Sequence, residues 1–236
     1  MSKPAPVVRA EEVEKRYGSG ENATIAVRGV SLSVAPGEFL ALMGRSGGGK
    51  TTLLNLLGAM DLPTSGRVWL DGNDTTQLDD DALTVLRRRS VGFVFQAFHL
   101  LPTLSVRENI EIPLLLLHQR GERQQRVEAL AARVELSSKL SSFPHQLSGG
   151  EMQRAAIARA LVHHPGLVIA DEPTGNLDTQ SAAMVIELLA ALSREAGTAV
   201  IMATHSHEAA AFADRIVELS DGALVSPPTK RMAPRV

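Results

Sequence analysis

The chain has 236 residues, and 24 lysines and arginines against 26 aspartates and glutamates give it a formal net charge of −2. Its 44% hydrophobic and 21% charged residues are typical of a globular domain, which excludes disorder for most of the chain. No apolar run approaches the roughly 18 residues that span a bilayer, the first ten residues lack the apolar core of a signal peptide, and there is no cysteine. We therefore expect one cytosolic domain without disulfides. Near-neutral charge with one Trp and one Tyr also predicts no nucleic-acid partner.

The predicted elements alternate between short apolar strands and helices, a pattern typical of an α/β fold with a buried parallel sheet. Along the chain, strands are expected at 39–43, 92–95, 167–171, 199–203 and 216–219, and helices at 50–58, 125–136, 151–163, 181–196 and 206–213. Residues 30–34 and 67–70 alternate as half-exposed strands do, which predicts an antiparallel β portion near the N-terminus.

The spacing of these elements predicts the domain organisation. No strand is expected between 97 and 165, so this segment is predicted to be a helical subdomain inserted into a core formed by 1–96 and 166–225. The last segment, 226–236, contains three prolines and three basic residues and is expected to be a flexible tail.

A phosphate-binding loop is predicted directly after the strand at 39–43. Residues 44–51 fit the pattern G-x-x-x-x-G-K-[ST] and lead into a helix, as the mechanism of this motif requires. Lys50 can reach the β and γ phosphates, and the Thr51 hydroxyl can ligate Mg²⁺. The candidate nucleotide-binding residues are Gly44, Arg45, Ser46, Gly47, Gly48, Gly49, Lys50, Thr51 and Thr52. The alternative is a glycine-rich turn without function. The motif predicts a nucleoside triphosphate site but does not by itself choose between a kinase, a GTPase, a helicase and a transporter ATPase.

Two carboxylates end the apolar strand at 167–171. From this position Asp171 can hold Mg²⁺ near the phosphates of such a loop. Glu172, beside it, can orient an attacking water and accept its proton, and we assign it as the general base. The alternative is an acidic loop that only aids solubility, which the four apolar residues ahead of the acids disfavour.

A third motif begins at Ser148. Ser148 and Glu151 fit a capping box at the start of a helix. A cap does not need the two glycines between them, Gly149 and Gly150, which are expected where the backbone closely approaches an anionic group.

At this point the sequence resembles the ATP-binding cassette (ABC) ATPases, because independent motifs recur over nearly the whole chain in that family's order. The matches are Tyr17 to the aromatic residue that stacks on adenine, 44–51 to the Walker A motif, Gln96 to the Q-loop glutamine, 147–151 to the signature, 167–172 to the Walker B strand with its catalytic glutamate, 176–178 to the D-loop and His205 to the switch histidine. For Tyr17 the alternative is a residue that only packs beside a strand. One departure is Glu151, where the commonest signature has Gln.

The resemblance implies a P-loop NTPase fold of the RecA-like type with an N-terminal antiparallel portion and a helical subdomain. It also implies that two cassettes form a head-to-tail homodimer around two ATP molecules. Each ATP would lie between the Walker A loop of one copy and Ser148, Gly149 and Gly150 of the other, and Asp178 would contact across the same interface. Gln96 and His205 would sense Mg²⁺, water and the γ-phosphate, with Gln96 as a further metal ligand.

The segment 92–109 and the segment 173–178 resemble the lipoprotein-release (LolD), macrolide-exporter (MacB) and cell-division (FtsE) branch of the family. This implies a peripheral ATPase on the cytoplasmic side of the inner membrane. In the macrolide exporter the cassette is fused to its membrane domain, whereas this sequence ends at Val236, so we expect the transmembrane permease to be a separate chain. Phe98, Leu100 and Leu101 are candidates for contacting it. The alternative is a soluble or regulatory ABC ATPase that is not coupled to transport.

Histidines raise two minor possibilities. His205 and His207 form H-x-H, but with no cysteine and no acidic cluster nearby in sequence we predict no zinc site. His163 and His164 are expected to place a favourable charge at the C-terminal end of the helix at 151–163.

Overall fold

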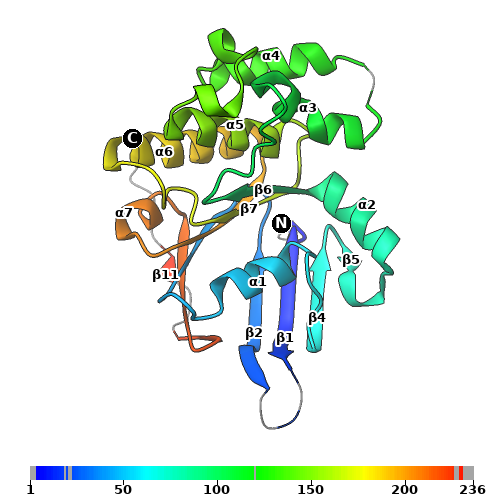
Figure 1. The fold of residues 1–236 in the computed structure, drawn as a ribbon. Helices are drawn as coiled ribbons and strands as arrows, with labels where there is room; N and C mark the ends of the chain where they lie inside the picture. Colours follow the sequence, from blue (N-terminus) through cyan, green and yellow to red (C-terminus); the bar gives the residue numbers. More distant parts are fainter. Residues whose placement is uncertain (1–3, 19, 21–22, 120, 226–228, 231–236) are drawn as a thin grey trace.

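The computed structural model describes residues 4–18, 20, 23–119, 121–225 and 229–230. Figure 1 shows two β-sheets with helix α1 between them and a group of helices over the far face of the larger sheet. The described residues thus form an α/β fold with parallel and antiparallel parts, as predicted from the sequence.

The larger sheet is mainly parallel. Its strand order is β10-β9-β3-β8-β7-β6, and β11 also pairs with β9. The bounds are β3 Phe39–Met43, β6 Val91–Phe95, β7 Leu167–Asp171, β8 Ala199–Thr204, β9 Arg215–Ser220, β10 Ala223–Leu224 and β11 Thr229–Lys230. Strands β9, β3, β8, β7 and β6 run parallel, so their carboxyl ends meet at one edge of the sheet. That edge collects the residues that follow β3, β6, β7 and β8.

The smaller sheet is antiparallel, with the order β2-β1-β4-β5. Its strands are β1 Val8–Tyr17, β2 Thr24–Val34, β4 Ser65–Leu70 and β5 Asn73–Asp74. Pairing of β1 with both neighbours shifts register after Ala10 or Glu11, where Glu12 adopts a left-handed backbone with φ 46°. This bulge breaks the alternation of β1, which is why the sequence pattern did not predict the strand.

Seven α-helices are described: α1 Lys50–Leu57, α2 Asp80–Ser90, α3 Val106–Leu116, α4 Arg123–Arg133, α5 Gly149–Leu161, α6 Thr179–Ala196 and α7 His207–Ala210. Between 97 and 165 the described residues form helices and no strand, as predicted. None of the helices in the described part of the chain has the length and hydropathy to span a bilayer.

Successive side chains of each parallel strand point to opposite faces of the sheet, and both faces are buried. Along β3, Leu40 and Leu42 belong to the core shared with α1 and the antiparallel sheet, whereas Phe39 and Ala41 belong to the core shared with α3 to α6. Burial on both faces requires nearly continuous apolar strands, which is the pattern the sequence shows here.

Some expectations need correction. Helix α4 begins and ends earlier than 125–136, α7 is shorter than 206–213, and α2 and α3 were not predicted as helices. Within the expected tail, Thr229–Lys230 pair with β9, so those two residues are part of the sheet. The tail residues 226–228 and 231–236 lie outside the described part.

Candidate functional site

The loop after β3 turns sharply into α1 because glycines occupy its tightest positions. Gly44 and Gly49 have φ values of 153° and 95°, and a Cβ atom on Gly49 would collide with the carbonyl oxygen of Ala26. Gly49 is also the N-cap of α1 and offers no capping side chain. The N–H groups in the first turn of α1 are therefore left for another acceptor, and a phosphate is the acceptor that suits a helix N-terminus.

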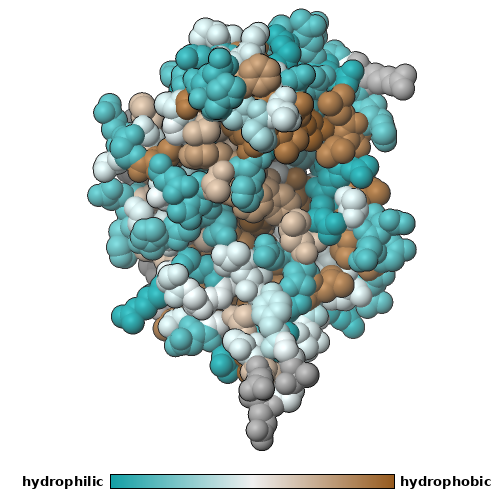
Figure 2. Space-filling view, in the orientation of Figure 1, coloured by the Kyte–Doolittle hydropathy of each residue, from teal (hydrophilic) through white to brown (hydrophobic). Residues whose placement is uncertain are grey.

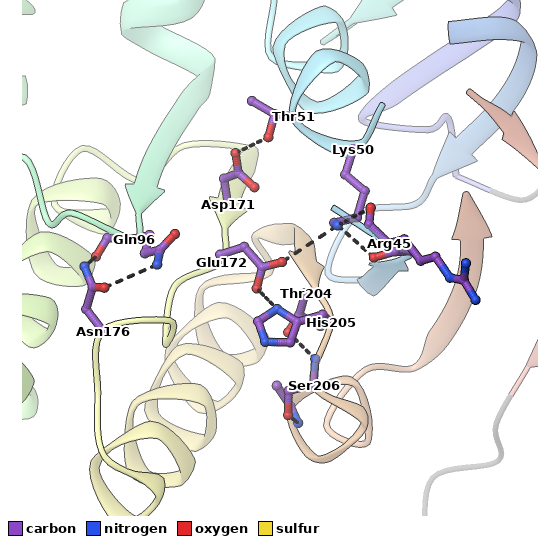
Figure 3. Close-up of polar contacts among 12 residues, drawn as sticks. Arg45, Lys50, Thr51, Gln96, Asp171, Glu172, Asn176, Thr204, His205 and Ser206 are labelled. Atoms are coloured by element: carbon purple, nitrogen blue, oxygen red, sulfur yellow. Dashed lines mark hydrogen bonds and ion pairs between the residues drawn. The ribbon is translucent and has the colours of Figure 1, made fainter. Parts of the chain in front are cut away.

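Lys50 turns its ammonium group back into this loop. Its Nζ atom donates to the carbonyl oxygens of Gly44, at 2.8 Å, and Arg45, at 3.1 Å, and only 8% of the residue is exposed. The same atom lies 3.8 Å from Oε1 of Glu172. In Figure 3 the guanidinium of Arg45 points away from these groups. The loop thus holds one buried cation beside the carboxylates that end β7.

A cavity of about 650 Å³ opens over this loop. Its lining includes Ala26, Ser46, Gly47, Gly49, Lys50, Thr51, Thr52, Phe95, Gln96, Ala97, His99, Asp171, Glu172 and His205. Most of these residues end or follow β3, β6, β7 and β8, and Ala26 comes from β2. The structure therefore brings the predicted loop, Gln96, both carboxylates and His205 to one place.

Thr51 and Asp171 form a pair of oxygen ligands on one wall of the cavity. The Thr51 hydroxyl donates to Oδ2 of Asp171 at 2.8 Å. Burial raises the pKa of Asp171, and the neighbouring charge of Glu172 raises it further. A hydroxyl and a carboxylate are ligands that Mg²⁺ prefers, and this cation would favour the ionised form of Asp171. The residues present fit a magnesium ion.

Glu172 lies between two partners. Its Oε2 atom is 2.9 Å from Nδ1 of His205, and its Oε1 atom faces Lys50 (Figure 3). Its backbone is left-handed, with φ 47°, a conformation that is unusual for a residue with a side chain and often found at functional sites. The carboxylate is thus fixed in orientation and aimed into the cavity.

Gln96 lines the cavity, but its amide is bonded elsewhere. Its Nε2 atom donates to Oδ1 of Asn176 at 3.2 Å, and Nδ2 of Asn176 donates to the Gln96 carbonyl oxygen at 3.0 Å. The sequence resemblance places Asn176 in the D-loop but assigns it no role. The two residues are 80 positions apart, and their pairing follows from the adjacency of β6 and β7.

The signature residues lie away from this cavity. Ser148 caps α5 in a capping box: its Oγ accepts from the Glu151 N–H at 3.2 Å, and its own N–H donates to Glu151 Oε2 at 2.8 Å. Gly149 adjoins Leu177, and Asp178 caps α6 by accepting from the Ser181 N–H. None of Ser148, Gly149, Gly150 and Asp178 is among the residues that line the cavity in the described structure.

Tyr17 lies near the loop but is not among the cavity's lining residues in the described structure. The residue is 45% exposed, and its hydroxyl donates to Oδ2 of Asp61 at 2.9 Å. Partial burial and Asp61 raise the pKa of Tyr17, while a hydrogen bond with Thr52 opposes this shift. Since Thr52 does line the cavity, Tyr17 is adjacent to the site, and its contact with adenine stays a prediction.

The prediction of a charge on His163 is wrong. Helix α5 ends at Leu161, and His163 is buried with its Nε2 atom 3.3 Å from the carbonyl oxygen of Val91. Burial lowers the pKa of His163 to about 4. The side chain is therefore neutral near pH 7 and does not interact with the helix dipole as a cation.

A glycine-rich loop between a parallel strand and a helix, a buried lysine, and an acidic neighbouring strand end define a P-loop nucleoside triphosphate-binding protein. The comparisons with known proteins narrow this class. A family model described as ABC transporter matches residues 27–175. The chain therefore belongs to the ABC transporter family, in which it is an ATP-binding cassette.

Individual relatives agree with this assignment. The macrolide export ATP-binding/permease protein MacB of Brucella melitensis is 45% identical over 228 residues, which cover 96% of this chain and 35% of that protein. An uncharacterised ABC transporter ATP-binding protein of Methanocaldococcus jannaschii is 44% identical, with 93% of this chain and 98% of the relative covered. This chain thus spans about a third of the length of the export relative.

A solved structure matches the fold. The dimeric post-hydrolysis state of the ATP-binding cassette MJ0796, bound to ADP and Pi, has a TM-score of 0.86 and 41% identity. The match covers 94% of this chain and 98% of that one. The predicted P-loop NTPase fold is confirmed.

Proposed function

We propose that the chain is the ATP-hydrolysing subunit of a membrane transporter complex. The observation that carries this proposal is the convergence on one cavity of Lys50, the Thr51–Asp171 pair and the Glu172–His205 pair. Each pair joins residues that are far apart in the sequence, so the arrangement is a product of the fold. It provides the groups that phosphoryl transfer to water requires.

Nucleotide binding would use the loop and the start of α1. The N–H groups of the first turn and the Lys50 ammonium would hold the phosphates, exchanging the bonds of Lys50 to Gly44 and Arg45 for charge-assisted ones. Thr51 and Asp171 would hold Mg²⁺, with Gln96 as the third predicted ligand. When bound, Mg²⁺ supplies neutralisation of the charge that develops on the phosphate oxygens.

Hydrolysis would depend on Glu172. A carboxylate aimed into the cavity can orient a water molecule and accept its proton during attack on the γ-phosphate. Nδ1 of His205 holds Oε2 of Glu172, which leaves Oε1 toward the cavity and Lys50. His205 lies in the loop after β8, so a movement of this loop would change the orientation of the Glu172 carboxylate.

Two copies would complete the site. Ser148, Gly149 and Gly150 form a glycine-rich helix N-terminus outside the chain's own cavity, which suits a phosphate held by another copy. The matched cassette MJ0796 is named as a dimer, which supports this arrangement. We infer a homodimer with the signature of each copy on the ATP of the other.

A membrane partner would dock in a groove beside β6. The groove has a volume of about 520 Å³, and its lining includes Met60, Phe93, Leu101, Ile112 and Leu116 together with Arg87, Arg88 and Arg159. Figure 2 shows apolar surface gathered over the C-terminal end of α3, facing α2. Of the three apolar candidates after Gln96, Leu101 lines the groove and is 48% exposed, whereas Leu100 packs against the core. An apolar groove with arginines fits an amphipathic segment of a transmembrane permease.

This partner would place the cassette peripherally on the cytoplasmic side of the inner membrane. The relative named as a macrolide export ATP-binding/permease protein supports an export role. Lipoprotein release stays a prediction from the sequence resemblance, and a permease on a separate chain stays a prediction as well.

The test is a purification in mild detergent from the membranes of the source cells, followed by mass spectrometry. We compare the tagged wild-type chain with the double variant Leu101→Glu/Leu116→Glu. Val85→Glu is the matched control, because Val85 is 58% exposed but does not line the groove. We expect a transmembrane protein to accompany the wild type and the control and to be lost with the double variant. Recovery of the wild-type chain without any membrane protein would instead support a soluble or regulatory ABC ATPase.

A further inference from the structure

Helix α5 carries a fully buried amide near its N-terminal end. Gln153 is 0% exposed, and its Nε2 atom donates to the carbonyl oxygen of Pro173 at 2.5 Å and lies 3.5 Å from that of Phe95. Both neighbours are acceptors, so the NH₂ group must face them. The Oε1 atom of Gln153 is buried without a hydrogen-bond partner among the described residues.

The two acceptors adjoin the predicted catalytic residues. Pro173 directly follows Glu172, and Phe95 directly precedes Gln96. They are 20 and 58 positions from Gln153 in the sequence. One side chain of the signature helix therefore reaches the backbone of both loops from which the proposed base and the proposed metal ligand project.

The same helix fixes the loop after β6 at a second point. Arg159 donates through Nη1 to the carbonyl oxygen of His99, at 2.6 Å, and through Nη2 to that of Phe98, at 2.9 Å. Phe98 and His99 both have left-handed backbones, with φ values of 61° and 49°. Without these bonds the left-handed backbone of the loop would have less support. The loop from Phe95 to His99 is thus held to α5 at both ends.

We propose that Gln153 is a positioning residue that transmits the position of the signature helix to Glu172 and Gln96 of the same chain. The inference rests on the proposed function, because it assumes that Glu172 and Gln96 act in ATP hydrolysis. Ser148, Gly149 and Gly150 begin the helix that holds Gln153. A shift of α5 when these residues engage the second copy moves the carbonyl oxygens of Phe95 and Pro173 with it.

Gln153→Met tests the proposal, because methionine keeps the length of the side chain and removes the donor. Gln153→Glu keeps the shape and an oxygen but also loses the NH₂ group. We expect both variants to lower kcat for ATP hydrolysis at least tenfold, with KM and the Kd for a fluorescent ATP analogue within about twofold of wild type. A loss of nucleotide affinity equal to the loss of kcat would show a general disturbance and overturn the positioning role.

Asn109→Leu is the matched control. Asn109 is also 0% exposed on a helix, and its amide holds Leu101, Leu104 and Ser105, none of which is a predicted catalytic residue. We expect this variant to lose thermal stability but to keep kcat within about twofold of wild type. An equal fall in kcat for Asn109→Leu and Gln153→Met would assign the effect to stability and overturn the proposal.

Hydrogen–deuterium exchange without nucleotide gives a readout that does not depend on turnover. We expect Gln153→Met to speed exchange in peptides covering 95–99 and 172–176, and Asn109→Leu to leave those peptides unchanged. If the wild-type protein does not hydrolyse ATP, the proposed function is wrong. The exchange data would still show whether Gln153 holds the two loops in place. Unchanged exchange in both peptides, or a wild-type kcat in Gln153→Met, would contradict the inference.

Discussion

Burial shifts the titration of two residues of this molecule in opposite directions for one physical reason. Loss of water disfavours the charged form, so burial raises the pKa of the Asp171 carboxyl and lowers the pKa of the His163 imidazole. Asp171 lines the nucleotide cavity, where a cation would restore its charge. His163 lies in the lining of the groove beside β6, which also includes Arg87 and Arg159. The pKa shift of Asp171 therefore affects cation binding, and the pKa shift of His163 affects the stability of the fold.

His163 should make the protein less stable in mild acid. Its pKa is about 4 in the folded chain and about 6.5 when unfolded, so between these values the unfolded chain binds more protons. The free energy of unfolding should fall by about 2 kcal/mol from His163 between pH 7 and pH 5. Urea unfolding at both pH values measures this loss for the wild type and for His163→Gln, which cannot titrate.

The comparison with His163→Gln isolates the residue from other titrating groups. We expect the variant to be less dependent on pH by that same amount, while its stability at pH 7 is lower or equal. An identical decline with falling pH in the two proteins would show that His163 is not the group that takes up the proton.

The site residues that could be predicted from chemistry alone belong to contiguous motifs, whereas Gln96 and His205 were predicted only from the family resemblance. Lys50 and Thr51 stand in register with the glycines of their loop, and Asp171 and Glu172 directly follow an apolar strand. Asn176 and Gln153 could not be assigned a role, because their partners are 80 and up to 58 positions away. The pairing of β6 with β7 brings Asn176 to its partner, and the packing of α5 against the sheet brings Gln153 to its partners.

At the scale of elements, α5 is held directly against strand β6. A Cβ atom on Gly92 would collide with the carbonyl oxygen of Ala160, so the backbones of the two elements are in contact at this point. Together with Gln153 and Arg159, this contact attaches the whole length of α5 to β6 and to the loop that follows it. The signature helix and the Gln96 loop therefore behave as one unit.

Gly92→Ala should separate these elements. We expect a loss of about 1–3 kcal/mol in the free energy of unfolding, because the added methyl group meets backbone that cannot rotate away. Gly121→Ala is the matched control, since a Cβ atom on Gly121 has nothing within 4 Å. Chemical denaturation of both variants measures the difference. A Gly92→Ala protein as stable as the control would contradict the close packing of α5 on β6.

The two helices that could not be predicted differ in the reason: α2 is mostly polar, whereas α3 is apolar but contains Pro113, a residue that usually breaks a helix. Helix α2 buries only Leu83, Leu86 and Ser90 and is polar over most of its length, so few apolar residues mark it in the sequence. Its ends do follow simple rules: Asp79 caps it, two aspartates occupy the first turn, and Arg87, Arg88 and Arg89 occupy the last. The strands buried on both faces, such as β7 and β8, were predicted because burial demands continuous apolar sequence.

At the scale of the whole molecule, the chain presents two half-sites that do not meet. The cavity holds Lys50, Asp171 and Glu172, while Ser148 and Gly149 form a capped helix N-terminus outside it. A second copy in the opposite orientation would join each cavity to a signature, so that ATP binding favours the dimer. Hydrolysis would remove this link and reopen the pair, and the groove beside β6 would pass the movement to a membrane partner.

The measurement that tests this account most directly combines phosphate release with light scattering on purified Glu172→Gln in Mg-ATP. We expect hydrolysis at least roughly a hundredfold slower than in the wild type, because the proposed general base is gone. We also expect a particle of twice the 25.2 kDa chain mass to accumulate, since ATP stays bound between the copies. Adding Ser148→Arg to Glu172→Gln should return the particle to a single chain. Wild-type phosphate release by Glu172→Gln, or a single-chain mass at saturating ATP, would contradict the account.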